Sequence, residues 1–276
     1  MSVRIIPVSR IDTRGVDPSW KRLRQDVLEI AKSEPMLAAY LHDMVLRHFS
    51  LEGSLAYFLA NKLASPYFST TLLRDTIYDV LNASIPIRDA IRSDLEAVVE
   101  RDPAARSTAQ PFLNYKGFHA LQTYRITHWL WTNNRQQLAL HLQNRISEVF
   151  DVDIHPAAVI GMGILIDHGS GVVIGETAVV GDNVSILHEV TLGGTGKEAG
   201  DRHPKVGSGV MIGAGAKILG NIKIGEGSKI AAGSVVLSEV PPHSTVAGIP
   251  AKVVGRPKTS EPSRQMDQYV EFDYCI

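Results

Sequence analysis

The residues best suited to acid–base chemistry are one histidine and two aspartates at breaks in an otherwise regular pattern. Asp167 and His168 stand just before a two-residue insertion, and Asp153 lies 15 residues before His168. Because the pattern returns about every 18 residues, we expect Asp153 and His168 near the same corner of the fold. A carboxylate there can fix the tautomer of the imidazole and stabilise its protonated form. Without these neighbours, a histidine in such a corner is more often a packed or solvated residue.

A polar loop supplies the second group of candidate residues. It spans residues 193–205 with the sequence GGTGKEAGDRHPK and interrupts the regular pattern. Arg202 carries a planar fork of N–H donors that suits a carboxylate, and His203 beside it can exchange a proton with a reacting oxygen. Pro204 restricts the backbone of His203. The loop glycines could cradle phosphate, although GGTG lacks the ending of a P-loop. A loop on a rigid scaffold predicts a binding site.

Two pairs of small residues form a candidate binding strip. Ala214 and Gly215 are followed 18 residues later by Ala232 and Gly233, so the pairs are expected to stack at one corner. A strip without bulky side chains lets a long, thin ligand arm approach the backbone and bond to it. The same residues are equally suited to tight turns, so the strip alone does not identify a ligand.

A six-residue rhythm defines the element that must position these groups. Aliphatic residues recur at Ile154, Ile160, Ile166, Ile174, Val180, Ile186, Leu192, Val206, Ile212, Ile218, Ile224, Ile230 and Val236. This period cannot sustain a helical stripe, which needs about 3.6 residues, but it is three times the alternation of a strand. Each unit is therefore predicted to be one short strand and a turn.

Three such units form a triangular coil whose inward side chains stack on the next coil, about 4.8 Å away. Repeated coils predict a parallel β-helix over residues 151–256, with the loop projecting from it. Chance matches of Gly-rich and Val-rich strands are disfavoured, because so many units keep the same register.

Before residue 150 the apolar residues follow a helical period instead. Asp17 and Pro18 predict an N-cap and a first-turn proline. The apolar face that follows consists of Trp20, Leu23, Val27 and Ile30. A later helical stretch, residues 116–150, is broken near Asn133 and Asn134. We therefore predict an α+β chain whose helical domain, residues 1–150, caps the β-helix and contributes an oligomer contact.

The C-terminal segment, residues 257–276, has a different composition. It is polar and rich in Pro and Ser, so it is predicted to be a flexible tail. It ends in YVEFDYCI, and aromatic and aliphatic residues at a free C-terminus suggest docking to a partner. Composition alone favours the simpler interpretation, an unremarkable frayed end.

Charge and cysteine content exclude several classes of protein. A net charge of −1 gives no broad electrostatic reason to bind nucleic acid or an anionic membrane. Cys275 is the only cysteine, so a disulfide framework is excluded and a reducing compartment is indicated. No apolar run reaches the length of a signal peptide core or a membrane span, so we expect a cytoplasmic protein.

Several strings of the sequence resemble one family, the serine O-acetyltransferases. They are DIHPAA (153–158), DHGSGVVIGETA (167–178), VTLGGTGKEAGDRHPK (190–205), GVMIGAGAKILGNIKIG (209–225), AGIPAKVVG (247–255) and, in the helical region, KGFHALQTYRITHWLW (116–131). The DRHPK loop combined with the helical region is the most specific part. Other hexapeptide-repeat acyltransferases share strings such as AGIPAKVVG.

The resemblance implies a left-handed β-helix and transfer of the acetyl group of acetyl-CoA to the hydroxyl of L-serine. The product would be O-acetyl-L-serine, a precursor for cysteine biosynthesis. His168 matches the catalytic general base of the family and Asp153 its dyad carboxylate. The remaining family positions match Asp102 and Asp167 for the serine amine, Arg202 with His203 for its carboxylate, and Gly194, Thr195, Ala214, Ala232 and Gly233 for CoA.

The same resemblance implies partners but no permanent cofactor and no metal. Acetyl-CoA would be a co-substrate, and direct transfer in a ternary complex is expected, because the only thiol lies on the tail. The family forms a trimer-based homo-oligomer, a dimer of trimers, with active sites between neighbouring β-helices. Its C-terminal isoleucine, Ile276 in this chain, inserts into O-acetylserine sulfhydrylase. L-cysteine is expected to inhibit at the serine site.

Three other interpretations were weighed. One is a different hexapeptide acyltransferase. A second is a metal-dependent carbonic anhydrase on a β-helix, because His188 falls one coil after His168 and His155 lies near the first coil. That class needs three histidines between subunits and has no use for a CoA strip. The third is a non-enzymatic scaffold that docks through its tail, which the set of Asp153, His168 and Arg202 disfavours.

Overall fold

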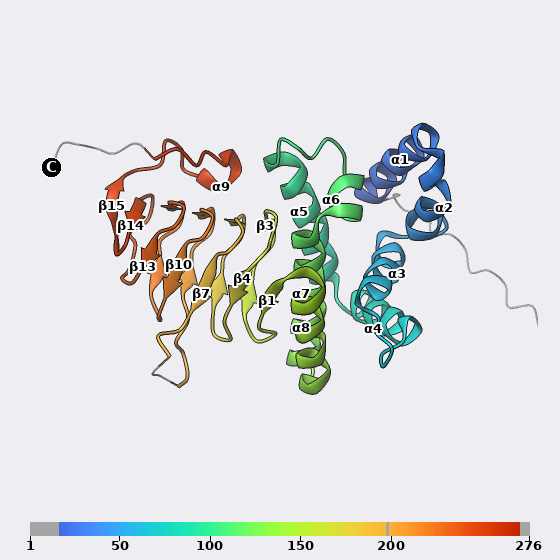
Figure 1. Cartoon of the computed structure of the whole chain (residues 1–276), viewed down its shortest axis with the longest axis horizontal. Coiled ribbons are helices and arrows are strands. Elements are labelled where there is room, and N and C mark those ends of the chain that lie inside the picture. The colour runs from blue at the N-terminus through green and yellow to red at the C-terminus, as the bar shows by residue number, and fades with distance from the viewer. Residues whose placement is uncertain (1–16, 197–198, 271–276) are drawn as a thin grey trace, which may run out of the picture.

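The computed structural model describes residues 17–196 and 199–270 of the chain. Helices occupy the first half and a β-helix the second (Figure 1). The helical elements are α1 (Pro18–Ser33), η1 (Pro35–Leu37), α2 (Ala38–Leu41), η2 (His42–Leu46), α3 (Leu51–Leu63), α4 (Thr70–Ala83), α5 (Ile85–Arg101), α6 (Ala109–Asn114), α7 (Lys116–Thr132) and α8 (Gln136–Phe150). In the described ranges, no helix combines the length and apolar character needed to cross a bilayer.

The first helix begins where its capping residues predict. The Asp17 side chain accepts a hydrogen bond from the backbone N–H of Ser19 at 3.0 Å, and Pro18 occupies the first helical position. An N-cap satisfies donors that have no partner within the helix. Trp20, Leu23 and Val27 are then buried, as their spacing predicts.

Helices α7 and α8 join the helical region to the β-helix. The chain breaks between them at Asn133 and Asn134, as predicted, and Asn134 adopts a positive φ of 61°. At their junction with the first coil, Arg125 forms a buried ion pair with Asp94 at 2.8 Å and donates to the Gly161 carbonyl at 2.7 Å. One hydrophobic core continues from the helices into the coils, so the two parts are packed as one unit.

The six-residue units form the strands of a parallel β-helix, and two further strands close its end, the first parallel to its neighbour in the preceding coil and the last antiparallel to the strand before it. These are β1 (Val152–Ile154), β2 (Val159–Ile160), β3 (Leu165–Ile166), β4 (Val172–Ile174), β5 (Val179–Val180), β6 (Ser185–Ile186), β7 (Thr191–Gly193), β8 (Lys205–Val206), β9 (Met211–Ile212), β10 (Lys217–Leu219), β11 (Lys223–Ile224), β12 (Lys229–Ile230), β13 (Val235–Val236), β14 (Thr245–Gly248) and β15 (Ala251–Gly255). The predicted parallel β-helix is confirmed.

Three sheets make the faces of the coil. The first sheet has the order β1-β4-β7-β10-β13, the second β11-β8-β5-β2, and the third β15-β14-β12-β9-β6-β3. Successive aliphatic residues pair across neighbouring coils, as in Ile154 with Ile174 and Ile174 with Leu192. Such a ladder buries one apolar residue per strand and leaves the turns free to carry polar groups.

Two corners of the coil matter for the site. The histidine corner joins the third sheet to the first and consists of the turns at residues 167–171, 187–190, 213–216 and 231–234. The loop corner joins the first sheet to the second and consists of the turns at residues 155–158, 175–178 and 194–204. The first sheet therefore separates them.

The segment after β15 runs back along the third sheet toward the helices. Helix α9 (Pro262–Gln265) lies beside α5 (Figure 1), and Pro262 and Ser263 are buried. The Arg264 guanidinium pairs with Glu100 at 3.0 Å, and the buried Lys229 donates to the Tyr269 carbonyl at 2.6 Å. Part of the predicted tail, residues 257–270, thus contacts the fold through these interactions and the burial of Pro262 and Ser263. Ile276 lies outside the described residues.

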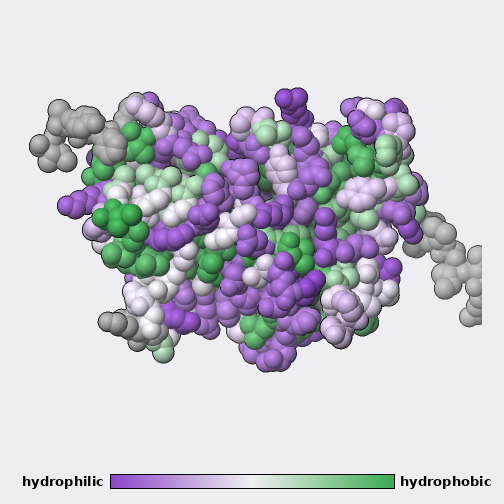
Figure 2. Space-filling view, viewed as in Figure 1, coloured by the Kyte–Doolittle hydropathy of each residue, from purple (hydrophilic) through white to green (hydrophobic). Residues whose placement is uncertain are grey.

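The surface in view is mostly hydrophilic, with hydrophobic side chains gathered toward the two ends of the molecule (Figure 2). Exposed apolar residues include Met36, Phe49 and Tyr67 among the helices, and Leu237 and Ile249 in the last coil. Met36, Phe49 and Tyr67 are each more than 90% exposed.

Candidate active site

The predicted base occupies a strained turn of the histidine corner. His168 has a left-handed backbone with a φ of 59°, which is uncommon for a residue other than glycine. Its imidazole is 74% exposed, and Nε2 lies 3.9 Å from Oδ1 of Asp167, whose side chain is only 25% exposed. Strain of this kind tends to be kept where function requires it. The turn thus presents the imidazole to solvent beside a half-buried carboxylate.

The first turn of α7 packs directly against this corner. A Cβ atom on Gly117 would lie 2.1 Å from the Ile166 carbonyl oxygen, so only glycine allows this approach. Lys116 donates to the Ser170 hydroxyl at 2.6 Å, which fixes the far side of the same turn. The helical region therefore holds the His168 turn in place.

Asp102, Tyr115 and Asp167 line the same cavity and interact electrostatically. Asp102 is the C-cap of α5, and its Oδ1 accepts a hydrogen bond from Ala104 N at 2.8 Å. Burial raises the pKa of Tyr115 to about 12, and the Asp102 carboxylate, which accepts its hydrogen bond, adds to this rise. Burial also raises the pKa of Asp167, and the charge of Asp102 acts in the same direction against the opposing effect of His168. Two carboxylates this close favour a bound cation.

These side chains line one cavity of about 660 Å³. Its walls include Asp102, Tyr115, Asp167 and His168. The segment after β15, residues 256–270, which we call the strap, contributes Met266. A slightly larger cavity, of about 750 Å³, lies among the N-terminal helices beside Trp20 and Phe49, away from the predicted site residues. Of these two cavities, only the first is lined by residues that the sequence predicts to be in the site.

A second histidine lies one coil along the same corner. The rings of His168 and His188 are 5.7 Å apart and nearly perpendicular, as the spacing predicts. Nδ1 of His188 is buried without a hydrogen-bond partner. His155, in contrast, lies at the loop corner, where its ring contacts Trp131 at 5.1 Å. Among the described residues, no three His, Cys, Asp or Glu side chains come close enough to hold a metal ion.

The predicted strip of small residues continues this corner. The N–H of Gly233 donates to the Ala214 carbonyl at 2.7 Å, and the N–H of Gly215 donates to the His188 carbonyl at 2.9 Å. A Cβ atom built on Gly233 would meet nothing within 4 Å, so the outer side of this turn is open. The base and the small residues, including Ala232, therefore share one edge of the β-helix.

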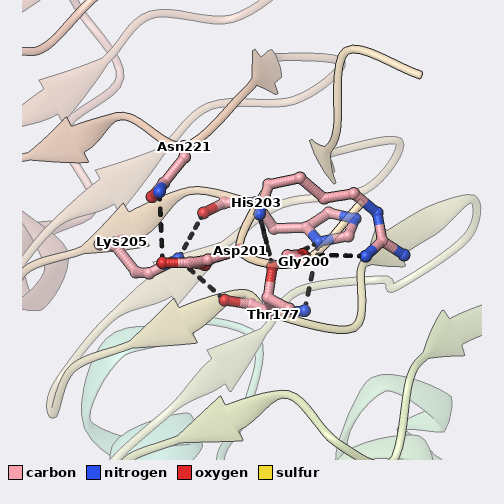
Figure 3. A network of polar contacts seen from close by, with 7 residues as sticks. Thr177, Gly200, Asp201, His203, Lys205 and Asn221 are labelled. Atoms are coloured by element: carbon pink, nitrogen blue, oxygen red, sulfur yellow. Dashed lines mark hydrogen bonds and ion pairs between the residues drawn. The ribbon is translucent and has the colours of Figure 1, made fainter. Parts of the chain in front are cut away.

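The loop corner is organised around a threonine hydroxyl (Figure 3). Thr177 Oγ1 accepts hydrogen bonds from the backbone N–H groups of Arg202 and His203 at 3.0 and 3.1 Å. The Thr177 backbone N–H donates to Nδ1 of His203 at 3.2 Å, so the neutral ring carries its proton on Nε2. Burial lowers the pKa of His203, and the charge of Arg202 lowers it further. His203 is thus a fixed, neutral imidazole.

A lysine and an asparagine lock the end of the loop. Lys205 donates to Asp201 at 2.6 Å and to the Thr177 and His203 carbonyls at 2.9 and 2.7 Å (Figure 3). Asn221 donates to the other oxygen of Asp201 at 3.2 Å. These contacts hold the loop close to the coil at its C-terminal end.

The Arg202 guanidinium already has a carboxylate partner. Its Nη2 donates to Glu176 at 2.8 Å, and this hydrogen bond lowers the pKa of Glu176. Nη1 donates to the Gly200 carbonyl at 3.0 Å. The arginine is therefore oriented by the chain itself, with a carboxylate in the position that a ligand carboxylate would take.

The structure does not bring Asp153 to His168. Asp153 lies in β1 beside Val173 of β4, and its Oδ1 accepts a hydrogen bond from Gln143 at 2.7 Å. Its negative charge acts on His155 at the loop corner. The prediction that Asp153 and His168 share a corner of one chain is wrong, because the 15-residue spacing places Asp153 on the first sheet instead.

The described site residues therefore form two groups in one chain. Asp102, Asp167 and His168 gather at the histidine corner, whereas Asp153, Arg202 and His203 gather at the loop corner. Sequence reasoning missed the supporting groups Tyr115, Lys116, Thr177 and Glu176. Glu176 and Thr177 lie in the motif DHGSGVVIGETA, but nothing in their spacing indicates that they contact a loop 25 residues later.

Comparison with known proteins identifies the class of this site. A model described as the N-terminal domain of serine acetyltransferase matches residues 19–123. A model described as the bacterial transferase hexapeptide, with six repeats, matches residues 203–238. A helical domain of this type followed by hexapeptide repeats defines an acyltransferase.

The chain belongs to the serine acetyltransferase family. It is 55% identical over 250 residues to serine acetyltransferase from Haemophilus influenzae, covering 91% of this chain and 94% of that relative. The crystal structure of serine acetyltransferase from Vibrio cholerae superposes with a TM-score of 0.90 at 54% identity, covering 91% of this chain and 97% of the other.

Two ligand complexes of similar proteins also match. A soybean serine acetyltransferase complexed with serine has a TM-score of 0.84 at 56% identity and covers 86% of this chain and 97% of its own. A Brucella abortus enzyme in complex with coenzyme A has a TM-score of 0.86 at 51% identity and covers 87% of this chain and 96% of its own.

Proposed function

We propose that this acyltransferase transfers the acetyl group of acetyl-CoA to the L-serine hydroxyl, with His168 as general base, and so supplies O-acetyl-L-serine for cysteine biosynthesis. The observation that carries the proposal is the exposed imidazole of His168 beside two carboxylates in one cavity. The serine and coenzyme A complexes of similar enzymes support the same pair of substrates.

The acceptor amine is assigned to Asp102 and Asp167. Their mutual repulsion, which contributes to the raised pKa of Asp167, is relieved when an ammonium group binds between them. This placement brings the serine hydroxyl toward the exposed ring of His168. Half-burial of Asp167 strengthens the contact, since a charge pair gains more where water is excluded.

The acceptor carboxylate is assigned to Arg202, which must come from a neighbouring subunit. In one chain the first sheet separates Arg202 from His168, so a complete site needs the histidine corner of one β-helix against the loop corner of the next. The same arrangement would bring Asp153 and His203 of one subunit toward His168 of another. A serine carboxylate would displace Glu176 from the guanidinium fork.

The chemistry is direct transfer. His168 removes the proton of the serine hydroxyl as its Oγ attacks the thioester carbonyl carbon, which forms a C–O bond. The tetrahedral intermediate collapses, the C–S bond breaks, and the imidazolium returns the proton to the departing thiolate. No protein thiol is needed as a carrier, so both substrates must be bound together.

Coenzyme A is assigned to the open strip that continues from His168. The backbone at Ala214, Ala232 and Gly233 offers amide groups without obstructing side chains, and Gly194 and Thr195 border the strip from the loop of an adjacent subunit. The thioester end would then lie at His168 and the remainder of the cofactor arm along successive coils.

The assembly proposed is a trimer of β-helices, paired into a dimer of trimers through the helical region. Exposed Met36, Phe49 and Tyr67 support a contact there. L-cysteine would compete for the serine site, in keeping with a similar enzyme solved in complex with cysteine. Ile276 is proposed to dock into O-acetylserine sulfhydrylase. Deletion of Ile276 should abolish co-elution with that enzyme and leave acetyl transfer intact; co-elution of the shortened chain would refute the docking role.

The activity is tested by measuring release of the CoA thiol from acetyl-CoA with three acceptors. L-serine should support rapid release, whereas homoserine and a sugar acceptor should be much poorer. An amine-blocked serine, N-acetylserine, is the matched control for the two carboxylates and should also be poor. Equal release with a sugar would indicate a different hexapeptide acyltransferase and overturn the assignment.

A further inference from the structure

Three consecutive residues at the C-terminal end of α5 make different contacts. Glu100 pairs with Arg264 of the strap at 3.0 Å, Arg101 is buried against the β-helix, and Asp102 lines the cavity. α9 lies beside this end of α5 in Figure 1. The position of Asp102 thus depends on how this end of the helix is held.

Arg101 is buried at a high cost. It is 4% exposed, and its guanidinium donates to neutral oxygens only, Ser185 Oγ and Asn183 Oδ1, both at 3.2 Å. Its Nε is buried with no hydrogen-bond partner, and burial lowers its pKa. In the described part of the chain it forms no ion pair within 4.0 Å. A buried cation without a carboxylate partner does not stabilise a fold by itself.

The oxygens that Arg101 contacts belong to the coil next to Asp167. Ser185 pairs with Leu165 across β6 and β3, and Asp167 follows β3 directly. The Ser185 hydroxyl in turn donates to the Ser263 carbonyl of the strap at 2.8 Å. Arg101 therefore links the helix end that carries Asp102 to the coil stack that carries Asp167 and His168.

The contact of Arg101 with the coil opposes the electrostatic repulsion between Asp102 and Asp167. Asp102 and Asp167 repel each other, and this repulsion contributes to the raised pKa of Asp167. Contacts between the end of α5 and the coil oppose the separation that this repulsion favours. A fork of N–H groups bound to two rigid coil residues resists that movement better than a single ammonium group can.

We propose that Arg101 is a positioning residue that holds Asp102 at the distance from Asp167 needed to bind the acceptor ammonium. The inference rests on the proposed function, because it assumes that this cavity takes the amine of serine. Arg101 acts through Asp102, and its effect is confined to acceptor binding. Preorganisation of this kind matters because a displacement of about 1 Å can cost about 10²-fold in rate.

The test compares Arg101→Met and Arg101→Lys with the wild-type oligomer. Arg101→Met should raise the KM for L-serine by about 10- to 100-fold, while the KM for acetyl-CoA and the kcat at saturating serine change by less than about threefold. Arg101→Lys keeps the charge but loses the fork, so it should give an intermediate KM. If Arg101→Met does not fold, Arg101→Lys alone decides the question.

Two controls separate positioning from stability. Tyr124→Phe removes the hydrogen bond from the buried Tyr124 hydroxyl to the Ala158 carbonyl in the same junction, and should lower the melting temperature without raising the KM for serine. Glu100→Gln breaks the adjacent, exposed pair with Arg264 and should change neither. A folded Arg101 variant with a lower melting temperature but an unchanged KM for serine would overturn the inference.

Asp102→Asn distinguishes this inference from the proposed function. If Asp102→Asn raises the KM for serine and the Arg101 variants do not, the positioning role fails and the amine site remains. If Asp102→Asn leaves the KM unchanged, the amine site itself is wrong and the positioning role fails with it.

Discussion

The histidine corner and the loop corner lie on opposite edges of one sheet and differ in how far their charges are satisfied. At the histidine corner two carboxylates repel each other, and the pKa of Asp167 is raised, chiefly by burial. At the loop corner Arg202 already binds Glu176, and the pKa of that glutamate is lowered. Among the described residues, Asp102 and Asp167 therefore form no ion pair with a lysine or arginine, whereas the Glu176 carboxylate is paired with the Arg202 guanidinium.

This difference assigns complementary roles to the two corners. An amino acid acceptor brings an ammonium, which Asp102 and Asp167 can bind, and a carboxylate, which Arg202 can take in exchange for Glu176. Within one chain the first sheet lies between the two corners. The charge pattern thus favours a zwitterionic acceptor bound between two subunits, and four predictions test it.

The largest effect is expected at the base. His168→Ala should lower kcat by about 10²- to 10⁴-fold, because it removes the exposed imidazole that is proposed to take the hydroxyl proton. His188→Ala is the matched control one coil away, and it should keep far more activity. Thiol release at saturating substrates measures both, with size-exclusion chromatography to show an intact assembly. Near-wild-type turnover by His168→Ala would contradict its role as base.

Mixed oligomers test whether the two corners belong to different subunits. His168→Ala and Arg202→Ala should each be almost inactive in the assay at low serine. Co-refolded in equal amounts, the two variants should recover about a quarter of wild-type activity. In random trimers about half of the histidine corners and half of the loop corners are intact, so about one site in four combines two intact corners. A chain carrying both substitutions, mixed with either single variant, should recover none. Failure of the first mixture to recover would place the site within one chain.

The sequence predicted the strands of the β-helix well, and the contacts of the site residues less well. The inward rows from Ile154 to Val236 follow from the six-residue period, and strands β1 to β13 lie where that period places them, whereas β14 and β15 lie beyond its last unit. The sequence places Asp153 at the wrong corner if every coil is taken to have 18 residues. The insertion in the turn at His168 lengthens the first coil, and Asp153 pairs with Val173 in the first sheet.

Contacts between distant segments could not be predicted from one sequence. Thr177 organises the loop through hydrogen bonds to residues 25 and 26 positions later, and Arg101 reaches a coil more than 80 residues away. The docked strap after residue 257 was also missed, because its polar composition is typical of a free tail. Its ion pairs and the burial of Pro262 depend on surfaces that only the folded coil provides.

A smaller effect on serine binding is expected when the Arg202 guanidinium is replaced. Arg202→Lys should raise the KM for L-serine by about 10-fold and leave the KM for acetyl-CoA unchanged, since a lysine cannot bind a carboxylate with two parallel hydrogen bonds. Glu176→Gln frees the fork from its internal partner and should lower the KM for serine slightly. If Glu176→Gln raises that KM as much as Arg202→Lys does, Glu176 positions the arginine instead of competing with the substrate.

The smallest expected effect is on stability, and it tests the opposite pKa shifts of Asp167 at the histidine corner and Glu176 at the loop corner. Because the folded protein raises the pKa of Asp167 above 3.8, the ionised carboxylate disfavours the folded state at neutral pH. Asp167→Asn should therefore raise the melting temperature at pH 7 by about 2 °C, even though it weakens serine binding. The gain should shrink as the pH falls through the folded pKa of Asp167, since the wild-type carboxyl is then neutral as well.

The matched change at the other corner has the opposite sign. The pKa of Glu176 is lowered, so its carboxylate favours the folded state above its ordinary pKa, and Glu176→Gln should lower the melting temperature at pH 7. Because Glu176 is largely solvated, that loss should be small and should diminish at high salt. Thermal unfolding of both variants between pH 4 and 8 measures the two signs together. Equal signs for Asp167→Asn and Glu176→Gln would remove the charge contrast on which the assignment of ammonium and carboxylate to the two corners depends.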